Sequence, residues 1–220
     1  LAGFAALVIH SNLPSLDTLT DYRPKIPLRI YSDEGLLIGE FGAERRNVVN
    51  ISDVPVHLKQ AILAAEDDRF YEHGGVDYLG VLRAAYSNFS AGSVRQGAST
   101  ITMQVARNFF LTREKTLTRK FSEALLAFKI ENNLSKDKIL ELYVNQIYLG
   151  QRSYGFAAAA QTYFGKSLQE INIAEAAMLA GLPKAPSSYN PISNPKRAKS
   201  RQLYVLGRLH QLNYISSEEL

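Results

Sequence analysis

The sequence contains no cysteine, so neither a disulfide framework nor a thiolate metal site can form. Glycine and proline are scarce, at 14 and 8 of 220 residues, which is too few for a disordered or linker-like chain. Internal repeats and low-complexity runs are also lacking. What remains is an ordinary globular composition, with 46% hydrophobic and 21% charged residues. The length suits one domain with a sizeable core, or two small ones.

Long hydrophobic runs are lacking as well. An apolar stretch at the N-terminus (1–9, LAGFAALVI) is far shorter than the roughly 20 residues that a membrane-spanning helix needs. Because the sequence begins at Leu rather than Met, we interpret residues 1–14 as the end of a truncated membrane anchor and residues 15–220 as the folded domain. A signal-peptide remnant or a small buried segment is the alternative.

The excess of positive charge is small. A net charge of +4 and a pI of about 9.2 suit a phosphate-rich partner, such as an anionic bilayer or a phosphorylated substrate, but they also suit simple solubility. No aromatic–basic stacking platform or recognition motif accompanies the basic residues, which argues against nucleic-acid binding.

Hydrophobic periodicity predicts a mainly helical domain with a small β element near its start. Residues 30–38 predict a hairpin around the turn Asp33-Glu34-Gly35. Residues 87–97 hold Ser, Asn and Gly without periodicity and predict a loop. Helices are expected over 55–66, 77–89, 99–109, 116–128, 135–150, 154–165, 173–182 and from 194 onward.

Four carboxylates lie within seven residues at the end of a predicted helix, in the segment 66–74 (EDDRFYEHG). Repulsion between like charges and the negative end of the helix dipole both raise the pKa of a carboxylate, which suits a general base. A solvated acidic loop, with Arg69 and His73 as surface partners, is the alternative that the spacing leaves open.

A net positive face is predicted on the helix after residue 116. Glu123 lies three residues from Lys120 and four from Arg119, so the three side chains share one face. Two cations against one anion leave positive charge that can hold a diphosphate. Lys115 and Arg107 extend this charge upstream. An ordinary exposed salt-bridge face is the alternative.

Two further segments offer polar groups. In 95–104 (RQGASTITMQ), a glycine-containing loop leads into a helix capped by Ser99, and helix N-termini bind phosphate readily. It lacks the lysine and the spacing of a nucleotide P-loop, so ATP or GTP is not expected, and a plain N-cap is the alternative. In 145–155 (NQIYLGQRSYG), most apolar positions suit a core, but Asn145 and Tyr148 could reach a sugar.

Five segments resemble, in their residues and in their order along the chain, the motifs of the family 51 peptidoglycan glycosyltransferases. The resemblance covers about residues 28–215 and is greatest to the penicillin-binding protein 1a branch of Gram-negative bacteria, through IPLRIYSDEGLLIGEFG near the start. Ala98, Met103 and Arg107 depart mildly from the family pattern, and Arg107 offers a phosphate a different geometry from the usual lysine. The five segments are EDDRFYEH (66–73), RQGASTITMQVARN (95–108), RKFSE (119–123), KILELYVNQIYLGQRSYGFAAAAQTYFGK (138–166) and EAAMLAGLPKAP (175–186).

The resemblance implies a mainly α, lysozyme-like bilobal fold, with a head and a membrane-associated jaw, and lipid II as the substrate. It makes Glu66 the general base that deprotonates the 4-hydroxyl of the acceptor. That oxygen then attacks the anomeric carbon of the growing chain with inversion, and undecaprenyl diphosphate leaves. Glu123 is the second carboxylate, which Arg119 and Lys120 keep ionised beside the diphosphate.

Further substrate contacts are expected from the same motifs. Phe109, Phe110 and Leu111 match the jaw and are expected to touch lipid, with a place in the core as the alternative. No cofactor is required, although a divalent cation (Mg²⁺ or Mn²⁺) near the diphosphate stays open, and no ligand set has metal-binding spacing. The remaining substrate-binding residues are Lys115, Gln104, Arg107, Asn108, Ser99, Thr100, His73, Asn145 and Tyr148.

The resemblance also implies a single-pass inner-membrane protein with its catalytic domain on the periplasmic side. Its expected partners are the bilayer, the growing glycan strand, a covalently linked transpeptidase domain and cell-wall assembly or activator proteins, without nucleic acid. Two other classes stay open. A lysozyme-like hydrolase or lytic transglycosylase would also use Glu66 but needs no diphosphate pocket, and a non-catalytic cell-wall scaffold would leave both carboxylates dispensable.

Overall fold

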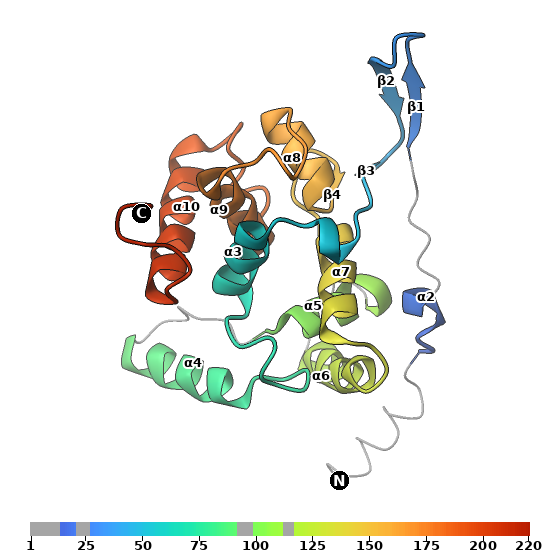
Figure 1. Ribbon diagram of the computed structural model, residues 1–220. Coiled ribbons are helices and arrows are strands. Elements are labelled where there is room, and N and C mark those ends of the chain that lie inside the picture. Colours follow the sequence, from blue (N-terminus) through green and yellow to red (C-terminus); the bar gives the residue numbers. More distant parts are fainter. Residues whose placement is uncertain (1–13, 21–26, 92–98, 112–116) are drawn as a thin grey trace. The chain divides into compact units, whose positions relative to one another are not determined.

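The computed structural model describes residues 14–20, 27–91, 99–111 and 117–220 (Figure 1). Most of the proposed anchor segment and Lys115 lie outside these ranges. Within the described ranges, no helix is both long and apolar enough to cross a membrane. The chain divides into two compact units, one formed by Glu66–Tyr143 with the residues up to Tyr22, the other by Arg23–Ala65 with Val144–Leu220.

The first unit is helical. Helix α5 packs against α6, and the buried run of α5 from Ile101 to Ala106 supplies much of its core. Leu126 and Ile130 of α6 and the loop residue Phe70 are almost completely buried in the same unit. Its helices are α2 (Asp17–Thr20), α4 (Tyr78–Ala91), α5 (Ile101–Phe110), α6 (Leu117–Glu131) and most of α7 (Lys136–Gln146).

The second unit contains the strands and the remaining helices. Strands β1 and β2 form an antiparallel hairpin, β3 pairs in parallel with β4, and α9 packs against α10. Small side chains allow close packing here, as in the buried alanines of α8. Its elements are β1 (Leu28–Tyr31), β2 (Leu37–Phe41), β3 (Arg45–Arg46), η1 (Ile51–Asp53), α3 (Val56–Glu66) except its last residue, the end of α7, β4 (Ser153–Tyr154), α8 (Phe156–Phe164), α9 (Ile173–Gly181), η2 (Leu182–Lys184) and α10 (Pro195–Gln211).

The predicted fold class is confirmed, because the chain is mainly helical with small strands near its start. The hairpin turns at Gly35, whose φ of 80° favours glycine. Gly165 ends α8 with a left-handed φ of 66°, as the sequence predicted for that helix end. The capping box of Asn172 and Glu175 begins α9, and Ser135 Oγ accepts a hydrogen bond from the Lys138 amide at the start of α7.

The loop predicted over 87–97 is wrong for its first residues, because α4 continues to Ala91. Single Ser and Asn residues cost a helix only about 0.5 kcal/mol each, and Phe89 continues the apolar spacing of Val81 and Ala85. The remaining residues of that segment, 92–97, lie outside the described ranges.

Helix α7 ends at Gln146 rather than at Gly150. The chain there enters a tight turn in which Gly150, Gln151 and Arg152 have φ values of 89°, 47° and 61°. Tyr148 forms an isolated bridge with Tyr154. The helix predicted over 135–150 therefore extended too far, into this turn.

Gly155 gives a test of this turn. Its φ is 86°, and a Cβ there would lie 2.8 Å from the carbonyl oxygen of Asn145. We expect Gly155→Ala to lower the free energy of unfolding by at least about 1–3 kcal/mol, measured by urea denaturation. Gly207→Ala in α10 is the control, because an added Cβ would meet nothing within 4 Å beyond the adjacent backbone of its own helix, and it is expected to raise stability by about 0.4–1 kcal/mol. Equal effects of the two substitutions would contradict the strained turn.

Candidate active site

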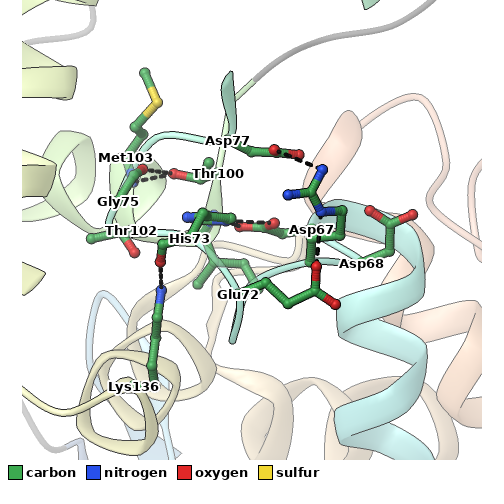
Figure 2. Close-up of polar contacts among 12 residues, drawn as sticks. Asp67, Asp68, Glu72, His73, Gly75, Asp77, Thr100, Thr102, Met103 and Lys136 are labelled. Atoms are coloured by element: carbon green, nitrogen blue, oxygen red, sulfur yellow. Dashed lines mark hydrogen bonds and ion pairs between the residues drawn. The ribbon is translucent and has the colours of Figure 1, made fainter. Parts of the chain in front are cut away.

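Asp67 joins the end of α3 to the start of α5. Its carboxylate is 3% exposed and accepts hydrogen bonds from the Ile101 amide at 3.0 Å and from His73 Nε2 at 2.9 Å (Figure 2). An anion at a helix N-terminus is stabilised by the free N–H groups and by the helix dipole. Asp67 therefore fixes the first turn of α5 against the loop that follows Glu66.

Thr100 is the residue at the N-cap position of the same helix. Its hydroxyl accepts from the Met103 amide at 3.2 Å and donates to the Gly75 carbonyl at 2.6 Å, as Figure 2 shows. Thr100, rather than the predicted Ser99, is thus the N-cap of α5. The loop from residue 67 to residue 77 is bound to α5 at both Asp67 and Gly75.

His73 is the buried partner of Asp67. Its side chain is 5% exposed, and its ring meets Phe70 edge-on with 6.4 Å between ring centroids. Nε2 lies 2.9 Å from one Asp67 oxygen and 3.1 Å from the other, so it faces both oxygens of the carboxylate. The structure thus places His73 inside the first unit, and its predicted contact with substrate stays a prediction.

Glu66 is the last residue of α3, as predicted, and is half-buried. Gln104 Nε2 donates to Glu66 Oε2 at 2.8 Å, and Gln104 itself is 5% exposed. Gln104 lies three residues after Ile101, one turn along α5. The adjacent carboxylates Glu66 and Asp67 therefore hold neighbouring turns of the same helix.

The other carboxylates of the acidic segment each have a partner of their own. Asp67 is bound to His73 and α5, Asp68 lies 3.4 Å from Arg83, and Glu72 lies 3.0 Å from Arg69. The effect of these charges on Glu66 stays a prediction. The solvated acidic loop is wrong for Asp67, which is buried.

The second candidate carboxylate, Glu123, is completely buried on α6. Lys120 Nζ lies 2.7 Å from Glu123 Oε2, and Arg119 Nη1 binds Glu123 Oε1. Lys120 also donates to the hydroxyl of Ser99. The predicted shared face is confirmed, and the burial of Glu123 rules out an ordinary exposed salt bridge.

These contacts link both carboxylates to the start of α5. Glu66 is bound through Gln104 on the helix, and Glu123 through Lys120 and Ser99, which stands just before the N-cap. One helix terminus thus sets the position of an acid bound to a neutral amide and of an acid bound to two cations.

The other expected substrate residues are spread over the chain, and their roles stay predictions. Arg107 is half-buried and Asn108 is exposed, both near the end of α5. In the second unit, Asn145 is 4% exposed and bonds both the amide and the carbonyl of Val49, while Tyr148 is 40% exposed. Among the described residues, no group of three or more His, Asp or Glu is arranged to hold a metal ion.

Sequence reasoning missed the role of Asp67, which it counted only as one of several like charges. No local pattern marks it, because its partner amide is 34 residues away. It also missed the buried contacts of Thr102, Glu131 and Lys136 in the same unit.

Two carboxylates held at one helix terminus are an arrangement that carboxylate-catalysed glycosyl transfer can use. Comparison with known proteins makes this specific. A family model described as Transglycosylase matches residues 34–210, and the chain belongs to this transglycosylase family. The expected family and the expected enzyme class are therefore confirmed.

The chain is similar to penicillin-binding protein 1A of Neisseria flavescens, with 60% identity over 219 residues, covering 100% of this chain and 27% of that protein. Penicillin-binding protein 1A of Pseudomonas aeruginosa is 49% identical over 214 residues, covering 97% of this chain and 26% of that protein. The crystal structure of penicillin-binding protein 1A from Haemophilus influenzae matches with a TM-score of 0.50 and 35% identity, covering 90% of this chain and 20% of that one. The chain thus spans about a quarter of the length of these curated relatives.

The Asp67 contacts predict a stability effect. Asp67→Asn keeps the size of the side chain, but an NH₂ group replaces one of the two oxygens, which lie 2.9 and 3.1 Å from His73 Nε2, and the negative charge at the start of α5 is lost. We expect the free energy of unfolding to fall by about 1–3 kcal/mol in urea titrations. Glu72→Gln is the control, because Glu72 is 67% exposed and lies in a surface ion pair with Arg69, and it should cost less than about 1 kcal/mol. A loss at Glu72 as large as that at Asp67 would contradict the special role of Asp67.

Proposed function

We propose that this chain is a peptidoglycan glycosyltransferase that polymerises lipid II into glycan strands, with inversion at the anomeric carbon and release of undecaprenyl diphosphate. The observation that carries the proposal is Glu123, buried between Lys120 and Arg119 in a chain of the transglycosylase family. A buried carboxylate held by two cations leaves a positive site for the charge that a departing diphosphate develops.

Glu66 is the general base of the proposed reaction. Gln104 donates to one of its oxygens and so fixes the orientation of the carboxylate. The base removes the proton from the acceptor 4-hydroxyl, whose oxygen forms the new bond to the anomeric carbon while the bond to the diphosphate breaks. Inversion needs one such displacement and no covalent intermediate, so a single correctly held base suffices.

The diphosphate is assigned to Lys120 and Arg119. The Lys120 side chain is 41% exposed, although Glu123 and Ser99 both bind its ammonium. It therefore presents a fixed cation to a ligand without first having to be ordered, which is the condition for effective stabilisation of a transition-state charge. Arg119 is less exposed, at 17%, and Glu123 holds the pair in place.

Contact with the bilayer is part of the proposal. Three neighbouring side chains at the start of α4, Tyr78, Leu79 and Leu82, are 65%, 60% and 66% exposed, which supports an apolar surface on the first unit. The stretch from Phe109 to Leu111, for which lipid contact was expected, is only half-buried, so both of its interpretations stay predictions.

The wider setting is proposed from the relatives. We assign residues 1–14 to the end of an inner-membrane anchor and residues 15–220 to a periplasmic glycosyltransferase domain. A covalently linked transpeptidase domain and cell-wall assembly or activator proteins complete the proposed arrangement, which is consistent with the small share of each relative that the chain covers.

The nearest rival, a hydrolase or lytic transglycosylase, would also use Glu66. It transfers no diphosphate, and so it gives no reason for a buried carboxylate that holds two cations in place. We therefore favour synthesis over cleavage.

Glu66→Gln tests the base. Glutamine keeps the shape and the contact with Gln104 but cannot take the proton, so glycan synthesis from lipid II should fall by about 10²–10⁴-fold without loss of folding. Glu72→Gln is the control, because Glu72 is 67% exposed and pairs with Arg69 at the surface, and it should retain parental activity. Synthesis by Glu66→Gln within a few-fold of the parent would remove Glu66 from the base role.

Lys120→Ala and Arg119→Ala test the diphosphate site. Loss of a fixed cation should cost about 2–4 kcal/mol of transition-state stabilisation, or about a 10²–10³-fold lower polymerisation rate, in a protein that stays folded by circular dichroism. Lys138→Ala is a matched control, because Lys138 is 44% exposed and pairs with a glutamate at the same spacing on α7. Normal turnover in either variant would exclude that residue from the diphosphate site.

A further inference from the structure

Lys136, the first residue of α7, stands at the centre of a polar cluster that the proposed reaction does not use. Its ammonium donates to the His73 carbonyl at 2.6 Å and to Glu131 Oε1 at 2.7 Å, and it lies 4.3 Å from the centroid of the Phe70 ring. The side chain is only 20% exposed, so this cation is largely removed from water. Figure 2 shows it reaching the loop that follows Glu66.

The same cluster contacts α5. Glu131, at the end of α6, is 9% exposed, and its Oε1 accepts from both Lys136 and the hydroxyl of Thr102 at 2.6 Å. Thr102 is completely buried in the first turn of α5. Residues of α5, α6 and α7 therefore meet at a single carboxylate oxygen.

His73 connects this cluster to the candidate catalytic residues. Its carbonyl binds Lys136, while its ring binds Asp67, the residue directly after Glu66. Asp67 in turn holds the Ile101 amide. Lys136 thus reaches α5 by two routes, through His73 and Asp67 to Ile101, and through Glu131 to Thr102.

We propose that Lys136 is a positioning residue for the glycosyl transfer proposed above, on which this inference rests. Its ammonium fixes the loop after Glu66 and the first turn of α5 to one another. The two segments carry Glu66 and Gln104, whose contact orients the base. Lys136 itself touches neither the acceptor nor the diphosphate, and it acts through the distance between these two side chains.

The decisive variant is Lys136→Met/Glu131→Gln, because it removes the cation without leaving a buried carboxylate uncompensated. With the His73 carbonyl released, the rate constant kcat for glycan synthesis should fall by about 10²-fold while KM for lipid II changes little, since small displacements of a base affect the chemical step most. Lys136→Arg keeps the charge and should recover part of kcat. Lys138→Met, on the same turn of α7 and in an exposed ion pair, should behave as the parent.

Amide hydrogen exchange supplies a second readout that needs no activity. Exchange of the Ile101 amide should accelerate in the double variant and stay unchanged in Lys138→Met, because only the first frees the loop that carries Asp67. Parental kcat in the double variant, or a KM rise with kcat unchanged, would overturn the positioning role. A parent protein that made no glycan would instead refute the proposed function, and Ile101 exchange alone would then decide whether Lys136 fixes this loop.

Discussion

The contact on which the rest of the candidate site depends is the capping of α5 by Asp67. A buried carboxylate binds the first amide of the helix and Nε2 of His73 at once. Asp67 directly follows Glu66, the candidate base. Helix α5 also carries Gln104, which donates a hydrogen bond to Glu66. The position at which the helix begins therefore affects how the carboxylate of Glu66 is oriented.

The two candidate acids differ in what surrounds them. Glu66 is half-buried and bound by a neutral amide, whereas Glu123 is completely buried and bound by Lys120 and Arg119. Ser99 and Gln104 stand on either side of the first turn of α5. Gln104 contacts Glu66 directly, whereas Ser99 contacts Lys120, which binds Glu123.

The sequence correctly predicted the features that depend on residues close together in the chain. The shared face of Arg119, Lys120 and Glu123 follows from helix spacing, and the Gly35 turn follows from the freedom of glycine at positive φ. The contacts made by Asp67 and Lys136 join residues 34 and 63 positions apart, and nothing in the local sequence marks them. Within segment 66–74, Arg69 and His73 are local partners of Glu72 and Asp67, whereas Arg83, the partner of Asp68, comes from α4.

Synthesis of glycan by Glu66 and Glu123 is the proposal that the products of the reaction decide. The protein is incubated with lipid II, the products are sized on a gel, and preformed glycan is followed in parallel. We expect a ladder of long glycan strands, release of undecaprenyl diphosphate and no shortening of the preformed glycan. Shortening of that glycan without any net synthesis would instead identify the protein as a hydrolase or lytic enzyme.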